Sequence, residues 1–336
     1  MTRAAGWVVL AGLLAALVPG CGGGDKKAQP AGRDVRLAAV IKGLDNPFFV
    51  TMRDGLVATA REQHAPLRLT AAPTGRQDTA GQASALESLA PGRPACYVVN
   101  PINPANLIRT LANIPDGTPV VNVDSPIAKE PAKAVGVEVT TYIGTDNIAA
   151  AKLGADAMAR LVGPGGRVAM ITGIPGDVAS GTRSEGFTLG VRGRFQVVET
   201  VAADYERSKA ERASEDLLRR DPHIAGFFAV NDLMALGVAD AVRAQGRRGK
   251  VAVVGFDGIR QALTAVRRGE LSATVAQYPY TMGQLAVEAC LAAVRRESVP
   301  ANIDAPIQVV SRQNVARAQA SFPKPAEAFN DPFSGR

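Results

Sequence analysis

The segment IAGFFAVNDLMALGVADAVRA, residues 224–244, contains the unit from which the fold is built. Its first seven residues are almost all apolar, and Asn231 and Asp232 follow directly. From residue 233 onward, apolar side chains recur at helical spacing. A short apolar strand followed by a helix is typical of a parallel sheet that is buried on both faces. The segment therefore predicts a strand–helix unit with polar side chains at its turn.

The same alternation extends in both directions from this segment. Further strands are predicted at 35–41, 67–72, 95–100, 119–124, 167–173, 195–201 and 250–258. Helices are predicted from Phe49 to Ala60 and at 77–89, 105–113, 149–161, 184–192, 206–220 and 259–267. Strands that alternate with helices in this way indicate parallel α/β sheets. About four or five units lie on each side of residues 132–146, which predicts two similar lobes.

Four predicted strands end in a polar side chain: Asn100, Asp124, Asn231 and Asp257. Ligands of open α/β sheets bind outside the carboxyl ends of the strands. Any one of these residues also has a plainer explanation, because Asn and Asp are common helix N-caps and turn formers. Their occurrence in both halves of the chain favours one shared polar site between two lobes.

The first twenty residues have the pattern of an export signal. Arg3 precedes an uncharged stretch at 4–18, which is shorter than the roughly 20 apolar residues of a membrane span. The stretch ends in LVPGC, which resembles the bacterial lipobox, although Pro19 is unusual there. The resemblance implies a lipid-anchored Cys21 followed by a flexible tether over 21–33; a plain secretory signal is the alternative.

The composition excludes several classes of protein. With 46% hydrophobic and 21% charged residues, the 336-residue chain is neither disordered throughout nor fibrous. Two His and three Cys give no metal site and no disulfide scaffold, so no metal or cofactor is predicted. Cys96 and Cys290 both lie in apolar segments, which favours two buried thiols and leaves a disulfide open. A net charge of +7 permits but does not require a nucleic-acid partner.

Nine short motifs resemble, in order, those of the ribose-type periplasmic sugar-binding proteins of bacterial ABC transporters. They are GLDNPFFVTMRDG (43–55), VVNP (98–101), PVVNVD (119–124), YIGTDN (142–147), RSEGF (183–187), AADYERSKA (202–210), AVNDLMALG (229–237), VVGFDG (253–258) and ATVAQYP (273–279). The resemblance covers residues 35–312. It implies two Rossmann-like lobes, 34–145 plus 278–305 and 146–277 plus 306–316, which are joined by three crossings. The crossings are expected near 145–146, 277–278 and 305–306.

The resemblance also implies which residues contact the ligand. The matching positions are Asn46, Phe48, Phe49, Asn100, Asp124, Tyr205, Asn231, Phe256, Asp257 and Gln277. Carboxylates and amides bind neighbouring hydroxyls, and aromatic rings cover the apolar faces of a sugar. Phe49 and Phe256 are also explained by core packing, and Asp257 by an N-cap role.

The chain departs from the ribose-binding pattern at three positions. Ser125 and Gly181 stand where ribose binders have arginines, and Lys42 stands where they have a serine. Fewer guanidinium donors predict a ligand other than ribose, such as another monosaccharide, a polyol or a cyclitol. Lys42 or Asp177 is a candidate for compensating contacts; a solvated Lys42 at the rim of the cleft is the alternative.

The predicted function is capture of such a ligand by closure of a hinge, and delivery to the permease subunits of an ABC importer with a separate ATPase. A ligand sensor for a membrane receptor uses the same features and stays open as an alternative. An N-terminal DNA-binding domain and catalytic motifs are absent from the sequence, so no nucleic-acid partner and no enzyme activity are predicted. A monomer at the cell envelope, in the periplasm or on the outer face of the cytoplasmic membrane, is expected.

The last twenty residues, 317–336, show no periodicity and contain three prolines, which predicts a disordered tail. Phe322, Phe329 and Phe333 leave packing on the surface or on a partner open.

Overall fold

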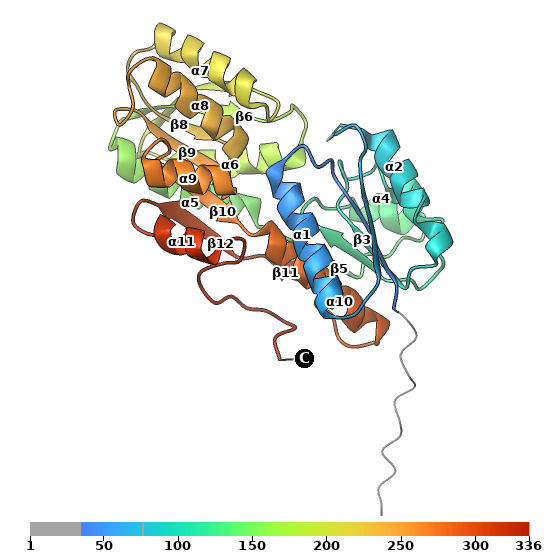
Figure 1. Ribbon diagram of the computed structural model, residues 1–336. Coiled ribbons are helices and arrows are strands. Elements are labelled where there is room, and N and C mark those ends of the chain that lie inside the picture. Colours follow the sequence, from blue (N-terminus) through green and yellow to red (C-terminus); the bar gives the residue numbers. More distant parts are fainter. Residues whose placement is uncertain (1–34, 76, 336) are drawn as a thin grey trace, which may run out of the picture. The chain divides into compact units, whose positions relative to one another are not determined.

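The computed structural model describes residues 35–75 and 77–335, which form two six-stranded sheets covered by helices (Figure 1). The predicted signal, Cys21 and the tether lie outside the described residues. Each sheet is parallel throughout, except for one antiparallel edge strand in the second. The predicted class, two α/β lobes with parallel sheets, is confirmed.

The first sheet has the strand order β11-β5-β4-β3-β1-β2. Its strands are β1 (Leu37–Ile41), β2 (Leu67–Ala71), β3 (Cys96–Val99), β4 (Val120–Val123), β5 (Thr141–Gly144) and β11 (Asn302–Asp304). Its helices are α1 (Pro47–Glu62), α2 (Thr79–Glu87), α3 (Ile108–Leu111), α4 (Lys129–Ala134) and α10 (Pro279–Val294), with a 3₁₀ turn at Ala90–Gly92. We call this half the N-terminal lobe.

Alternation along β1 shows why this sheet is covered on both faces. Leu37, Ala39 and Ile41 belong to one buried cluster, which includes side chains of α1 and α10. Ala38 and Val40 belong to a second cluster with side chains of α2 and α3. Successive strand residues point to opposite faces, so a strand that is apolar at every position needs helices on both sides.

The second sheet has the strand order β12-β10-β9-β8-β6-β7. Its strands are β6 (Arg167–Thr172), β7 (Gln196–Ala202), β8 (Ile224–Ala229), β9 (Ala252–Asp257), β10 (Ala273–Gln277) and β12 (Ile307–Ser311). Its helices are α5 (Asn147–Val162), α6 (Val178–Val191), α7 (Arg207–Arg220), α8 (Asp232–Ala244), α9 (Arg260–Arg268) and α11 (Val315–Ser321). Helices α7, α8 and α9 lie in front of the sheet in Figure 1, and α5 and α6 lie behind it. We call this half the C-terminal lobe.

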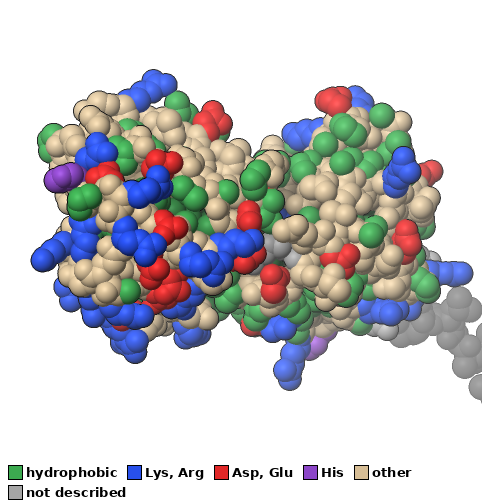
Figure 2. Space-filling view, turned by 90° about the horizontal axis from the view of Figure 1, so that it is seen from above, with side chains coloured by type: hydrophobic (Ala, Val, Ile, Leu, Met, Phe, Trp, Pro, Cys, Tyr) green, Lys and Arg blue, Asp and Glu red, His purple; other side chains and the backbone are tan. Residues whose placement is uncertain are grey.

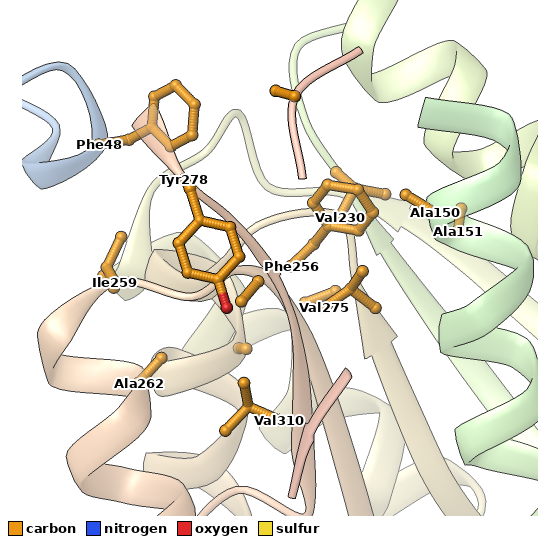
Figure 3. Close-up of a cluster of buried hydrophobic side chains, with 14 of the residues drawn as sticks. Phe48, Ala150, Ala151, Val230, Phe256, Ile259, Ala262, Val275, Tyr278 and Val310 are labelled. Carbon is orange, nitrogen blue, oxygen red and sulfur yellow. The ribbon is translucent and has the colours of Figure 1, made fainter. Parts of the chain in front are cut away.

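The chain passes between the two sheets three times. It leaves the first sheet after β5, returns to that lobe after β10, and leaves again between β11 and β12. Apolar side chains pack beside the second passage: Phe48 of α1 lies near Tyr278 (Figure 3). Phe256 lies beside Tyr278 in this view, and Val275 and Val310 lie below. Strand ends, helix starts and crossings therefore meet in one region.

Several helices differ from their predicted bounds, and in one case a local cap explains the difference. The helix expected at 184–192 begins at Val178, since the carboxylate of Asp177 accepts a hydrogen bond from Ser180 N. The helix expected at 105–113 contracts to four residues, and the stretch taken as a break around 132–139 includes part of α4.

The preferred prediction of two free thiols is wrong, because Cys96 and Cys290 form a disulfide. Helix α10 packs against β3 and brings the two Cα atoms to 5.7 Å, although 194 residues separate them in the chain. Both cysteines are fully buried. Apolar neighbours in the sequence are equally compatible with two buried thiols and with a buried disulfide, so they did not distinguish the two.

The prediction of a disordered tail over 317–336 is also wrong for the residues described, which end at 335. Helix α11 extends to Ser321, and Phe333 keeps only 7% of its surface exposed. Phe322 and Phe329 pack against the main buried cluster. Lys324 Nζ lies 5.5 Å from the ring centre of Tyr280 at the start of α10. Burial of these aromatic side chains, rather than regular secondary structure, holds the tail in place. The tail runs from α11 onto the N-terminal lobe (Figure 1).

Candidate functional site

The carboxyl ends of strands from both sheets surround a cavity of about 310 Å³. In the space-filling view, the surface narrows and is hollowed between the two halves (Figure 2). The N-terminal lobe contributes Lys42, Asn46, Phe48, Phe49, Gln77, Thr79, Ile102, Asn103 and Asp124. The C-terminal lobe contributes Ile174, Pro175, Gly176, Asp177, Ala179, Arg183, Tyr205, Asn231 and Asp257.

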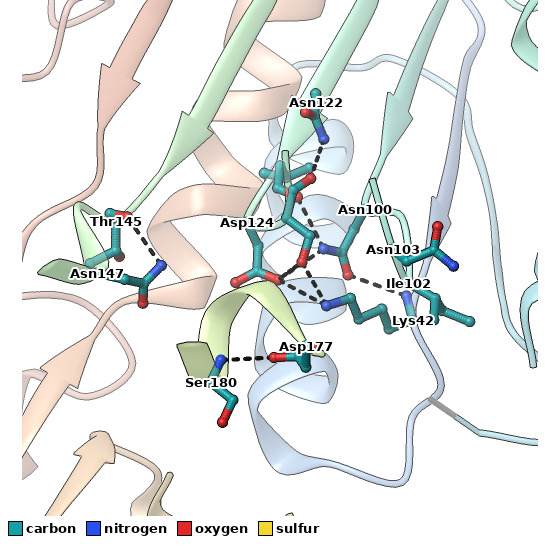
Figure 4. A network of polar contacts seen from close by, with 12 residues as sticks. Lys42, Asn100, Ile102, Asn103, Asn122, Asp124, Thr145, Asn147, Asp177 and Ser180 are labelled. Carbon is teal, nitrogen blue, oxygen red and sulfur yellow. Dashed lines mark hydrogen bonds and ion pairs between the residues drawn. The ribbon is translucent and has the colours of Figure 1, made fainter. Parts of the chain in front are cut away.

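A buried lysine provides the positive charge on the side of the N-terminal lobe. Lys42 Nζ donates to Ser125 Oγ at 2.6 Å and lies 3.7 Å from Asp124 Oδ2 (Figure 4). Asn100 donates to the same carboxylate oxygen at 3.0 Å and accepts from Lys42 N at 3.3 Å. Since Lys42 is only 7% exposed, the alternative of a solvated lysine at the rim is wrong.

A matching arrangement stands on the side of the C-terminal lobe. Arg183 Nη1 lies 3.2 Å from Asp257 Oδ1, and Gln277 Nε2 donates to the same oxygen at 2.9 Å. Arg183 also donates to Val230 O and Asn147 Oδ1. The sequence did not single out Arg183, although it begins the quoted motif at 183–187. Nothing in a single sequence showed that this side chain of α6 points inward.

Two aromatic side chains form one wall of the cavity. The rings of Phe48 and Phe49 meet edge to face, with centroids 5.2 Å apart. Asn46 caps α1 by accepting from Phe48 N at 2.9 Å, which holds both rings at the start of the helix. Lys42 Nζ lies 5.4 Å from the centre of the Phe49 ring. The wall therefore offers an apolar face beside a cation.

Phe256 does not line the cavity. It is fully buried in β9, and the guanidinium carbon of Arg183 lies 4.1 Å from its ring centre. The plainer reading of Phe256, core packing, agrees with this position. Its ring supports the arginine from below through a cation–π contact.

Helix caps account for the orientation of Asn231 and Asp177. Asn231 accepts from Met234 N at 3.0 Å, so it caps α8 while it lines the cavity. Tyr205 OH donates to Asp177 Oδ1, and burial followed by the charge of Asp177 raises the pKa of this phenol. The capping and site interpretations are thus compatible for Asn231. For Asp257 the N-cap interpretation is wrong, because the cap of α9 is Ile259.

Three residues that line the cavity have positive φ angles. Asp124, Tyr205 and Asp257 have φ values of 60°, 63° and 121°, a region that non-glycine residues rarely adopt. Such conformations persist where surrounding contacts determine them, and they cluster at binding sites.

Four other predicted positions do not line the cavity. Asn100 and Gln277 are buried and touch the lining acids rather than the cavity, and Ser125 and Gly181 are also outside its lining. A side chain built on Gly181 meets no atom within 4 Å. The residues that sequence reasoning missed are mainly loop positions, such as Gln77, Ile102 and Pro175, which carry no charge to mark them. Within the described ranges no group of three metal-ligating side chains is found.

Two parallel α/β lobes, three connecting passages and a polar cavity with an aromatic wall define a periplasmic-type solute-binding protein. The chain belongs to this family: residues 37–298 match the model of the periplasmic binding protein domain. In the part of the chain that the structure describes, no helix is long and apolar enough to cross a membrane.

Known proteins resemble the chain over most of its length. It is 31% identical to the ribose import binding protein of Bacillus subtilis, over 84% of this chain and 88% of the relative. It is 34% identical to the D-allose-binding periplasmic protein of Escherichia coli, over 73% and 80%. A solute-binding protein of Actinobacillus succinogenes with bound D-allose superposes with a TM-score of 0.78 at 27% identity, covering 84% of this chain and 99% of that one.

Proposed function

We propose that this protein captures a monosaccharide or a similar polyol in the cavity between its lobes and delivers it to an ABC importer. The observation that carries the proposal is the pair of buried cation–carboxylate groups, Lys42–Asp124 and Arg183–Asp257, in the lining of one cavity. Such groups present acceptors and donors to neighbouring hydroxyls, and charge-assisted hydrogen bonds are the stronger kind.

The remaining lining fits the same chemistry. Asn46 and Asn231 have side chains that both donate and accept, as hydroxyls do. Phe48 and Phe49 offer the apolar surface on which the C–H face of a sugar ring packs. A cavity of about 310 Å³ suits a small ligand. Because the ligand contacts both lobes, binding favours the conformation in which they close on it.

The ligand we propose is not ribose itself. Ser125 contributes a hydroxyl to the lysine network, and the space beside Gly181 is open. The donors therefore differ in kind and position from those of two arginines. The relatives named for ribose and D-allose point to aldoses, and a hexose, a cyclitol or another polyol presents the hydroxyls that these side chains bind.

The proposal extends to cellular location and partners. Export, a lipid anchor on Cys21 and a tether over 21–33 would hold a monomer at the outer face of the membrane, near permease subunits driven by a separate ATPase. Mass spectrometry of the protein from membranes tests the anchor: diacylglycerol and acyl mass on an N-terminal Cys21 is expected. An unmodified N-terminus would contradict it.

Binding is tested by calorimetry with D-ribose, D-allose, myo-inositol and xylitol, and with amino acids as controls. We expect 1:1 binding of one sugar or polyol, weaker binding of D-ribose and no binding of the amino acids. Failure of every sugar and polyol would tell against the proposal, and D-ribose as the tightest ligand would overturn the ligand class.

NMR of the ligand after incubation should show it unchanged, as a binding protein without enzyme activity requires. Uptake of the labelled ligand by cells lacking the protein should fall; normal uptake would favour the sensor instead.

A further inference from the structure

Asp232 is a completely buried carboxylate for which the proposed binding mode has no role. It is the first residue of α8 and follows Asn231, yet it does not line the cavity, and its exposed fraction is 0%. Burial of a carboxyl group is unfavourable unless hydrogen bonds compensate for the lost water. The bonds that compensate here connect three elements of the C-terminal lobe.

The two carboxyl oxygens of Asp232 hold different segments. Thr274 Oγ1 on β10 donates to Oδ1 at 2.7 Å. Ile259 N donates to Oδ2 at 2.9 Å, and Gly258 N–H also donates to the carboxyl group. Asp232 therefore joins the start of α8 to β10 and to the turn that follows β9.

That turn carries the cavity acid Asp257. Asp257 and Gly258 both have positive φ values, 121° and 74°. A non-glycine residue is rarely stable at such an angle unless its neighbours determine it. The Asp232 hydrogen bonds fix the two peptide N–H groups directly after Asp257. They thereby determine the direction in which the Asp257 side chain leaves the strand, toward Arg183 and Gln277.

Gly255 of β9 leaves the space that the Asp232 carboxylate occupies. A Cβ atom on Gly255 of β9 would lie 2.3 Å from Asp232 Oδ1, much closer than any non-bonded contact permits. Glycine in the middle of a buried strand is otherwise unfavourable, because it has no side chain to pack. Its presence at 255 is explained by the space that Asp232 occupies.

We infer that Asp232 is a positioning residue for ligand binding: it holds the 257–259 turn so that the carboxylate of Asp257 faces the cavity beside Arg183. This inference rests on the proposed binding function. Burial, with the charge of Asp257 as the next cause, raises the pKa of Asp232. A neutral side chain of the same shape is therefore a suitable replacement, which provides a conservative variant.

The test compares Asp232→Ala, Asp232→Asn and Gly255→Ala with wild type by calorimetry with D-allose, well below each unfolding transition. In Asp232→Asn, the amide oxygen accepts from Ile259 N and the amide nitrogen donates to Thr274 Oγ1. We expect Asp232→Ala and Gly255→Ala to weaken binding about tenfold or more, and Asp232→Asn to stay within about threefold of wild type.

The matched control is Leu217→Ala, a buried residue of α7 outside the cavity lining. It should lower the unfolding temperature and leave the affinity within about twofold, because loss of packing far from the cavity does not move Asp257. Equal loss of affinity in this control would show that general destabilisation explains the effect. Unchanged affinity in Asp232→Ala would overturn the positioning role.

Hydrogen exchange supplies a readout that needs no ligand. The amides of Gly258 and Ile259 should exchange faster in Asp232→Ala than in Leu217→Ala, and Thr274→Val provides a milder variant if Asp232→Ala does not fold. Unchanged exchange would overturn the inference. A wild-type protein that binds none of the sugars while these amides respond would instead count against the proposed function alone.

Discussion

Lys42 Nζ lies 2.6 Å from Ser125 Oγ, so a lysine that follows β1 is held by the loop that follows β4. The same ammonium group is 3.7 Å from Asp124 Oδ2, and both side chains are largely buried. A hydroxyl that can rotate to suit its partners thus orients a flexible cation beside the carboxylate. This arrangement places one positive charge at a fixed point of the cavity.

Replacing Lys42 by Met should therefore impair both binding and stability. The substitution keeps most of the side-chain length but leaves the Asp124 carboxylate without its cation, which costs about 3 kcal/mol for a buried pair. We expect chemical denaturation to show this loss and calorimetry to show at least about tenfold weaker binding of the ligand. The control is Lys129→Met on the exposed start of α4, expected to stay within about 0.5 kcal/mol. Wild-type affinity in Lys42→Met would show that Lys42 does not contribute to ligand binding.

Two glycines in helices should respond in opposite directions to alanine. Gly181 lies in α6, and a Cβ atom there meets nothing within 4 Å. Gly181→Ala should raise the free energy of unfolding by about 0.5–1 kcal/mol, since alanine has the higher helix propensity. Gly55 of α1 faces Tyr280 O, which a Cβ atom would approach to 2.1 Å, so Gly55→Ala should destabilise the protein. Thermal unfolding of both variants checks this, and equal signs would contradict the packing of α1 on α10.

Glu288 should make stability depend on pH near neutrality. Burial raises the pKa of this α10 carboxyl from 4.5 to about 6, and Oε2 has no hydrogen-bond partner among the described residues. The folded state therefore binds the proton more tightly than the unfolded state. The stabilisation of the folded state by protonated Glu288 is complete below about pH 4.5 and is lost as the pH rises through about 6.

Glu288→Gln should consequently melt a few degrees higher than wild type at pH 7.5, and the difference should shrink toward pH 4.5. Glu130→Gln, an exposed carboxyl group in α4, provides the comparison. A difference between wild type and Glu288→Gln that does not change with pH would contradict the assigned cause.

Phe333 should contribute to the stability of the fold, although only three residues follow it in the sequence. It is 7% exposed and belongs to the main buried cluster. Phe333→Ala should lower the free energy of unfolding by about 3–5 kcal/mol. Val57→Ala, which removes an exposed apolar side chain of α1, should have little effect. Equal stabilities of the two variants in urea would instead support the prediction of a disordered tail.

The fold class, which local patterns determine, was predicted correctly. The continuously apolar segment before Asn231 and the helix after it specify a parallel α/β unit, and repetition of that unit predicted the fold class. The acids that end β4 and β9, Asp124 and Asp257, line the cavity because strand ends of a parallel sheet meet at one edge.

Features that depend on distant contacts were missed or assigned incorrectly. Arg183 lies within α6, and its burial follows from Asp257 and Phe256, more than seventy residues away in the chain. The tail has no periodic pattern because it forms little regular structure after Ser321, yet Phe333 is buried by packing against the fold. Helical period and composition describe a segment alone, so they do not report the surface on which that segment packs.

The Cys96–Cys290 bond has a consequence for the integrity of the molecule. The chain that builds β6 to β10 leaves and returns between these two cysteines, so most of the C-terminal lobe belongs to a covalent ring closed within the N-terminal lobe. A protease that cuts one loop of that lobe opens the ring without releasing a fragment. The nicked protein would migrate as one band on a gel until a reductant separates the two pieces, and it would keep both walls of the cavity on a single molecule.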